Sequence, residues 1–194
     1  MQVTLDDYSQ GAVFATELVN TSPLVRVIAG DMLTGPQALK TLLDDNNVHP
    51  DALVHDLVDG SDLEQVRALR EVVREILDAS SPSVLVDLTR RMLSTVRHHV
   101  ELVQQEGRSW RWNVVPDNAL SLADELALFI GYALLGTLRT LGFERFRPCS
   151  SPTCNGVFVD TSRGGRRRYC MPALCGNRIN VANHRQRKQR LGDH

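Results

Sequence analysis

The chain has 194 residues, of which 42% are hydrophobic and 23% are charged, and such proportions are ordinary for a soluble globular protein. This length allows one good hydrophobic core with an appendage, or two small domains. No apolar run reaches the ~18 residues that a membrane-spanning helix needs, and no secretory or targeting segment is evident, so we expect a cytoplasmic protein without membrane contact.

The formal net charge of -1 conceals an asymmetry between two parts of the chain. Residues 1–144 carry 11 Lys and Arg against 21 Asp and Glu, for a net charge of -10. Residues 145–194 carry 11 basic against 2 acidic residues, for a net charge of +9. This polarity predicts an acidic body that carries a basic, anion-seeking module, although the two parts can also neutralise each other across an interface.

The first sixty residues predict short helices separated by turns. Apolar residues within 11–20 recur at helical spacing, and a second short helix is expected over 37–43. His49 and His55 flank Asp51, an arrangement that metal sites also use. Asp and Pro favour the first turn of a helix, so a helix start near Pro50 is the simpler interpretation.

Two long amphipathic helices are expected next. Ser61 and Glu64 form a capping-box pattern, and apolar residues from Leu63 to Leu77 follow at steps of three and four. After a break at Pro82, a second helix is predicted from about 83 to 105. Its inward stripe would consist of Leu85, Leu88, Met92, Val96, Val100 and Val103.

A short strand and a central helix complete the acidic part. Residues 109–115 alternate large apolar with polar side chains, as a strand does. This places Trp110 and Trp112 on one face, where they either wall a pocket or cover a helical core. Ser121 and Asp124 then cap a long helix that is apolar nearly all round, so we place it at the centre of a helical bundle.

The four cysteines of the chain follow the pattern Cys149-x4-Cys154-x15-Cys170-x4-Cys175. Two equally spaced pairs on tight turns can close a tetrahedral thiolate shell around one structural zinc ion, whereas a catalytic zinc normally keeps one position open for water. Disulfides are the alternative, but they are typical of secreted domains and no secretory signal is evident here. We therefore predict that these four residues bind one structural Zn²⁺.

The segment around the cysteines predicts a small finger. Residues 157–159 and 166–169 are expected to pair as a β-hairpin that turns at Gly164-Gly165. Asp160 is expected to accept hydrogen bonds from turn amides or an arginine. A helix should begin near Pro172 and continue to about residue 190. The expected fold is therefore mainly α: an N-terminal helical bundle and a small C-terminal finger of the treble-clef-like or zinc-ribbon type.

Basic side chains surround the expected hairpin and helix, and no carboxylate alternates with them. Guanidinium groups suit bidentate phosphate contacts, and an α-helix fits the major groove of B-DNA. We therefore predict DNA contacts at Arg166, Arg167, Arg168, Arg178, Arg185, Arg187, Lys188 and Arg190.

The C-terminal part also resembles a known family. The matching runs are Cys149-Ser-Ser-Pro-Thr-Cys154, Val157-Phe-Val-Asp-Thr-Ser-Arg163, Arg168-Tyr-Cys170 and Cys175-Gly-Asn-Arg178. They resemble the CGNR-type zinc finger, which in bacterial proteins follows a helical ABATE domain. The run Phe14-Ala-Thr-Glu-Leu-Val-Asn-Thr21, with Asp31-Met-Leu33 after it, is similar to the opening of that domain.

This resemblance implies a regulator of transcription, with an ABATE-like domain over residues 1–144 and a CGNR finger over residues 145–194. The first domain would sense a ligand or form a homodimer. By resemblance only, Glu17, Asn20 and Thr21 would contact a ligand, although a helix cap is the simpler account of Asn20-Thr21-Ser22.

Two other classes of function compete with DNA binding. A zinc-stabilised module can instead dock a protein, or the chain can sense a small ligand without touching DNA. An enzyme is not expected, because the sequence has no Gly-rich phosphate loop, no paired-carboxylate motif and no nucleophile with an evident base.

Overall fold

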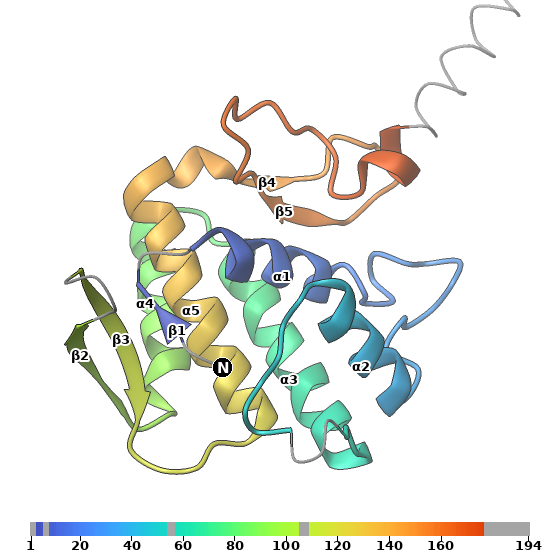
Figure 1. Cartoon of the computed structure of the whole chain (residues 1–194). Helices are drawn as coiled ribbons and strands as arrows, with labels where there is room; N and C mark the ends of the chain where they lie inside the picture. Colours follow the sequence, from blue (N-terminus) through green and yellow to red (C-terminus); the bar gives the residue numbers. More distant parts are fainter. Residues whose placement is uncertain (1–2, 6–7, 54–56, 105–108, 177–194) are drawn as a thin grey trace, which may run out of the picture.

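The computed structural model describes residues 3–5, 8–53, 57–104 and 109–176. Within these ranges it contains five α-helices and two small antiparallel sheets (Figure 1). The helices are α1 (Ser9–Val19), α2 (Pro36–Asp45), α3 (Gly60–Leu77), α4 (Pro82–Ser94) and α5 (Leu122–Leu141). One sheet, in the order β1-β3-β2, consists of β1 (Val3–Thr4), β2 (His98–Gln104) and β3 (Trp110–Pro116). The other consists of β4 (Phe146–Pro148) and β5 (Val157–Val159).

Helix α5 lies at the centre of the helical body, as its all-round apolar sequence predicts. It packs against α1, α3 and α4 (Figure 1). Two glycines permit the close approach of its neighbours. A Cβ on Gly11 of α1 would lie 2.5 Å from Cβ of Ala133, and one on Gly131 of α5 would lie 2.6 Å from Cδ2 of Leu93 on α4. None of the helices within the described ranges is long and apolar enough to cross a membrane.

Two expected helix starts differ from the structure. The capping residue of α3 is Asp59, which accepts from the amide of Asp62 while the Asp62 carboxylate accepts from the Asp59 amide. The expected box at Ser61 was therefore wrong by two residues. The described residues next to Pro50 form a turn rather than a helix start, and the amides of Asp51 and Ala52 donate to the carboxylate of Glu125, on α5. His55 lies outside the described residues.

The helix expected over 83–105 was wrong in its second half. Helix α4 ends at Ser94, and residues 98–104 form β2, which pairs antiparallel with β3 along its whole length. Val100 and Val103 fit the helical stripe, whereas Val100 and Leu102 fit the period of a strand, so the spacing of the apolar residues did not separate the two structures. The strand at Trp110–Pro116 was confirmed. Trp110 and Trp112 are 59% and 47% exposed, and neither is among the side chains packed on the hydrophobic core of the described residues.

The C-terminal sheet lies across α1, at the top of Figure 1, and β5 packs on both α1 and α3. Strand alternation divides the side chains of β5 between two cores. Val157 and Val159 join the main hydrophobic core together with Phe146, whereas Phe158 packs in a separate cluster with the cysteines. The expected hairpin was wrong: β5 pairs with β4, and residues 166–169 form no strand.

Candidate metal centre

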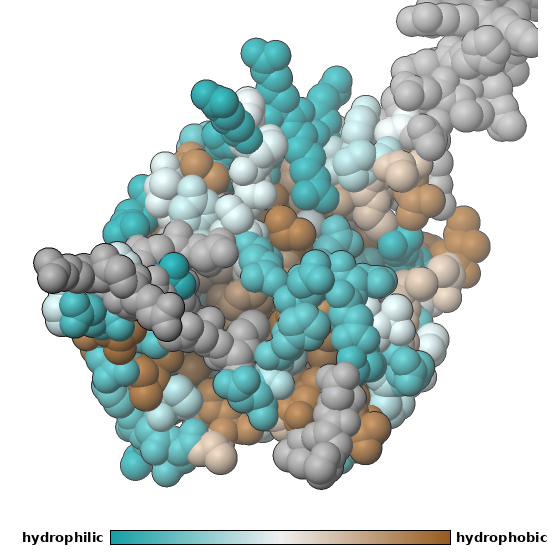
Figure 2. Space-filling model, viewed as in Figure 1, coloured by the Kyte–Doolittle hydropathy of each residue, from teal (hydrophilic) through white to brown (hydrophobic). Residues whose placement is uncertain are grey.

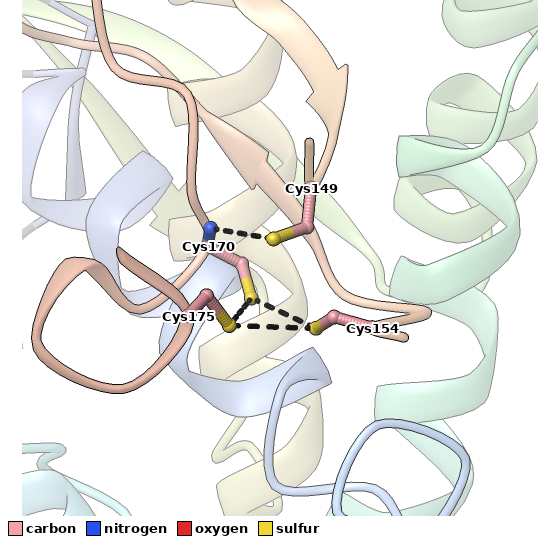
Figure 3. Close-up of side chains that lie close together, drawn as sticks. All are labelled: Cys149, Cys154, Cys170 and Cys175. Carbon is pink, nitrogen blue, oxygen red and sulfur yellow. Dashed lines mark hydrogen bonds between the residues drawn. The ribbon is translucent and has the colours of Figure 1, made fainter. Parts of the chain in front are cut away.

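The four cysteine sulfurs converge on one point (Figure 3). Cys149 follows β4, Cys154 lies on the loop between the two strands, and Cys175 lies on a single π-helical turn, η3 (Pro172–Gly176). Cys170 closes the set from the irregular segment before η3. All four sulfurs lie within 4.8 Å of one another, so the two pairs that the sequence spacing indicates form a single site.

The backbone holds each cysteine in a local turn. The Cys149 amide donates to the Gly156 carbonyl at 2.8 Å, which closes the first loop, and the Gly156 amide donates to Sγ of Cys154 at 3.4 Å. In the second pair, the Cys175 amide donates to the Met171 carbonyl at 2.8 Å. Amide-to-sulfur bonds favour thiolates, because they place partial positive charge next to the sulfur.

The sulfur geometry fits a tetrahedral zinc ion. Zinc–sulfur bonds of ~2.3 Å in a tetrahedron place the sulfurs about 3.8 Å apart. Sγ of Cys154 lies 3.5 Å from that of Cys170 and 3.7 Å from that of Cys175, and the last two lie 3.9 Å apart. All four cysteines are free thiols, so the disulfide alternative does not apply. Four sulfurs close the coordination shell, and the protein therefore holds one structural zinc.

The electrostatics of the four thiols explain why the site needs a cation. Burial and the neighbouring sulfurs raise the pKa of Cys175 to about 11, and burial raises the pKa of Cys170 still further. Burial also opposes ionisation of Cys149, but hydrogen bonds from the amides of Cys170 and Ser151 outweigh it and lower its pKa. Four thiolates this close repel one another, so metal binding must supply the charge that allows them to ionise together.

Side chains of α1 join the metal module to the helical body. Asn20 donates to the Val157 carbonyl at 2.8 Å and accepts from the Val157 amide at 3.3 Å. Thr16 accepts from the amide of Val159 at 3.0 Å. These two side chains satisfy the edge of β5 as a neighbouring strand would. On the other side of the loop, Arg74 of α3 donates to the Asn155 carbonyl at 2.8 Å.

The residues proposed by resemblance as ligand contacts therefore lie at this junction. Asn20 is 2% exposed and fully used in bonding to β5 and to the Thr16 carbonyl. Thr21 accepts from Arg70 at 3.1 Å, and Arg70 in turn forms a two-pronged ion pair with Asp31 at 2.7 and 2.8 Å. Glu17 lies partly buried near Arg167, and burial raises the pKa of its carboxyl although Arg167 and Arg26 act against the shift.

Asp160 organises the arginine-rich loop that follows β5. Its side chain is fully buried and accepts from the amide and hydroxyl of Ser162 and from the amide of Arg167. Burial opposes its ionisation, but these bonds prevail and hold the pKa of the carboxyl below its usual value. The sequence-based expectation for Asp160 as an acceptor of turn amides agrees with these contacts.

The arginines of the module divide into internal and exposed groups. Arg167 lies over the Phe158 ring at 4.9 Å and donates to the carbonyls of Tyr169 and Cys170, so its guanidinium supports the metal site. Arg163, Arg166 and Arg168 are exposed and form no ion pair with any described residue. Figure 2 shows long hydrophilic side chains projecting from this end of the molecule. Arg178, Arg185, Arg187, Lys188 and Arg190 lie outside the described residues.

The sequence did not indicate two residues that the site depends on. Gly156 has no room for a side chain, because a Cβ would lie 2.4 Å from Sγ of Cys170 and 2.8 Å from Oδ1 of Asn20. Arg147 donates to the Gly165 carbonyl at 2.9 Å and reaches Asp160 at 3.5 Å. Neither position belongs to a periodic pattern of apolar residues, so periodicity could not identify them. The one sequence feature that could have drawn attention to Gly156 is its position two residues after Cys154.

Fold and site together define a helical protein with a zinc module packed on its first helix. Residues 12–139 match the ABATE family, described as "putative stress-induced transcription regulator", and residues 145–188 match the CGNR zinc finger. The chain therefore belongs to the ABATE family and carries a CGNR zinc finger after the ABATE domain. A search of curated proteins found no match.

Proposed function

We propose that this protein regulates transcription by binding DNA through the zinc module, with the helical body as a sensing or dimerisation unit. The main support is the group of exposed arginines, Arg163, Arg166 and Arg168, on a loop that the buried Asp160 and the cysteine cluster hold in place. Exposed guanidinium groups without carboxylate partners suit phosphate oxygens. The family description points in the same direction.

The finer expectation of a treble-clef-like finger belongs to the same proposal. It assigns further phosphate contacts to Arg178, Arg185, Arg187, Lys188 and Arg190, which follow the last described residue, Gly176. In this proposal Arg167 supports the metal site from within, and the direct contacts come from the exposed arginines.

The test is a titration of duplex DNA of mixed sequence at several salt concentrations. Binding should weaken steeply with salt, since each neutralised phosphate releases a counterion. In the double variant Arg166→Glu/Arg168→Glu, affinity should fall at least ~10-fold, and the slope of log affinity against log salt should decrease by about 2. A flat salt dependence of the unaltered protein would refute direct DNA binding.

The matched control is the double variant Arg90→Glu/Arg97→Glu, which makes the same change of charge at two exposed positions, one on α4 and one just before β2. If phosphate contacts lie on the module, this variant binds DNA like the unaltered protein. An equal loss of affinity for Arg90→Glu/Arg97→Glu and for Arg166→Glu/Arg168→Glu would show that net charge alone causes the effect, and it would contradict the proposal.

A protein-docking function is the second candidate, and the β2–β3 hairpin favours it. Leu102 and Trp112 pair across this hairpin, and with Trp110 they are 46–59% exposed. Large exposed apolar side chains on one face are typical of interaction surfaces, including those of homodimers. Under this alternative, Leu102→Asp abolishes self-association or partner binding, and DNA binding is absent at every salt concentration.

The proposal is of a cytoplasmic binding protein rather than an enzyme. The four thiols form a closed metal shell, with no open coordination position for a water nucleophile. Release of a reaction product from any small molecule by the zinc-loaded protein would contradict this part of the proposal.

A further inference from the structure

A cavity of about 400 Å³ lies between the metal centre and the loop that follows α1. Its walls are mainly apolar, and its inner end reaches two of the zinc ligands, Cys154 and Cys175. The apolar side chains that line it are Val25, Val27, Ile28, Met171 and Leu174. Val27 and Ile28 are 74% and 92% exposed, so they form the outer rim of the cavity.

Of the four ligands, Cys154 alone is both accessible and in the cavity. Cys149, Cys170 and Cys175 are 9%, 0% and 1% exposed, whereas Cys154 is half-buried. Cys175 also lines the cavity, but its surrounding residues leave almost no surface open. Cys154 is therefore the most exposed of the zinc ligands on the cavity wall.

Ligation keeps a cysteine in its thiolate form, and the thiolate is the nucleophilic species. We propose that the cavity directs small apolar electrophiles, such as α,β-unsaturated carbonyl compounds, to Cys154. The apolar walls favour the hydrocarbon part of such a compound. Arg26, the charged residue of the lining, offers a hydrogen-bond donor for the carbonyl oxygen.

The reaction is a conjugate addition, and it needs neither an oxidant nor a reductant. The thiolate sulfur of Cys154 forms a bond to the β-carbon, the carbon–carbon π bond breaks, and its electron pair moves to the α-carbon. That carbon then takes a proton from water, which leaves as hydroxide and carries away the negative charge of the thiolate. The product is a neutral thioether, which is a much weaker zinc ligand than a thiolate.

The modification would also affect the helical body, because Cys154 directly precedes the residues that bond to α1 and α3. The next residue, Asn155, accepts from Arg74 at 2.8 Å and donates to the Leu24 carbonyl at 3.4 Å. Gly156 and Val157 follow, in contact with Asn20. Loss of the Cys154 ligand thus weakens the zinc site and the attachment of β5 to α1 together.

The experiment compares N-methylmaleimide with N-cyclohexylmaleimide on the full, zinc-loaded chain. Each reaction is stopped at low conversion, the adducts are located by peptide mass spectrometry, and zinc release is followed with a metal indicator. Rates are divided by those of the same reagents with glutathione, which removes their intrinsic reactivity. We expect most of the first adduct on Cys154, an excess of at least ~3-fold for the cyclohexyl reagent because apolar area is buried, and zinc release in step with adduct formation.

Two surface variants distinguish an effect of the cavity on the reaction rate from the effect of solvent exposure of the cysteine. Ile28→Asp places a charge in the lining and should bring the ratio of the two normalised rates close to that of glutathione. Val84→Asp, the same kind of change at an exposed position of α4, should leave the ratio unaltered. Even distribution of adducts over the cysteines, or a cyclohexyl-to-methyl ratio equal to that of glutathione in the unaltered protein, would overturn the inference. These measurements involve no DNA, so they stand apart from the test of the proposed function.

Discussion

The side chain of Asn20 forms the hydrogen bonds to the edge of β5 that a neighbouring strand would otherwise form. Its amide group exchanges two hydrogen bonds with the backbone of Val157, and Thr16, one helical turn earlier, satisfies the amide of Val159. Buried backbone groups without partners cost free energy, so these two side chains make docking of the metal module on α1 favourable. A pair of polar residues on an otherwise apolar helix face thus has a structural role that explains their burial.

Gly156 is the residue at which the metal centre and this junction meet. Gly156→Ala should lower both zinc affinity and the free energy of unfolding, the latter by about 2 kcal/mol or more, because the new methyl overlaps Sγ of Cys170 and Oδ1 of Asn20. Competition with a coloured chelator and denaturant titration measure the two effects.

Gly164→Ala is the control for that substitution, because the nearest atom to a Cβ there is Cγ of Arg166 at 3.9 Å. It should change neither property by more than about 0.5 kcal/mol. Wild-type zinc affinity in Gly156→Ala would show that the loop relaxes without cost and would contradict the tight junction described above.

Glu17 should make the protein less stable at neutral pH than glutamine would at the same position. Burial raises the pKa of Glu17 above its usual 4.5, despite Arg167 and Arg26. The folded state therefore binds the proton more tightly than the unfolded chain, and the penalty appears as the pH rises through the folded pKa. Glu17→Gln should raise the free energy of unfolding at pH 7, and the gain should disappear below pH 4.5, the usual value.

Denaturant titrations of both proteins at a series of pH values check this expectation. Since variant and wild type are compared at each pH, acid loss of zinc affects both alike. The exposed Glu75 provides the control, and Glu75→Gln should give no gain at pH 7. If Glu17→Gln is destabilising at pH 7, attraction to Arg167 and Arg26 outweighs burial.

At the scale of elements, β5 shows how three residues serve two cores. Val157 and Val159 point into the helical body, and Phe158 points toward the cysteines, where Arg167 covers its ring. Its partner is β4 rather than the segment that follows Gly165, because Arg147 and Asp160 hold that segment in an irregular loop through hydrogen bonds to its backbone. Side-chain bonding to the backbone competes with strand pairing in this way elsewhere in proteins.

The start of α3 distinguishes a real helix cap from a plausible sequence pattern. Asp59→Ala should cost about 1 kcal/mol of stability, since it leaves the amide of Asp62 without its acceptor. Ser61→Ala should cost only a few tenths of a kcal/mol, because Ser61 lies inside the helix and its hydroxyl accepts from the exposed side chain of Gln65. Thermal unfolding of the two variants gives the comparison, and a larger loss for Ser61→Ala would restore the box predicted from sequence.

At the scale of the whole molecule, the basic module and the acidic body share one core. Phe146, Val157 and Val159 pack among the helices, and Arg74 and Asn20 bond to the module from two different helices. Packing and hydrogen bonds therefore hold the two parts together in addition to the attraction between their opposite net charges. Arg163, Arg166 and Arg168 remain exposed at the surface of the module.

Removal of zinc should consequently destabilise the entire chain. Zinc ligation contributes on the order of 10 kcal/mol to small metal modules, so chelation should lower the melting temperature by at least ~10 °C in a single transition. Calorimetry with and without a chelator measures the shift. Restoration by Zn²⁺ but not by Mg²⁺ is the control, and an early transition of the module with the helical melting temperature unmoved would contradict a shared core.

The sequence by itself determined the features that depend on local pattern. The spacing of Cys149, Cys154, Cys170 and Cys175 identified the zinc site, and the all-round apolar run after Ser121 identified the central helix. These signals are reliable because ligand spacing and helical periodicity are properties of neighbouring residues.

Tertiary structure alone decided the rest. The pairing of β5 with β4 and the hydrogen bonds between Asn20 and Val157 join segments that lie apart in the sequence. Residues 98–104 form a strand although their apolar spacing also fits a helix. Such choices depend on which backbone groups and apolar faces find partners once the chain is folded, and no short window of sequence contains that information.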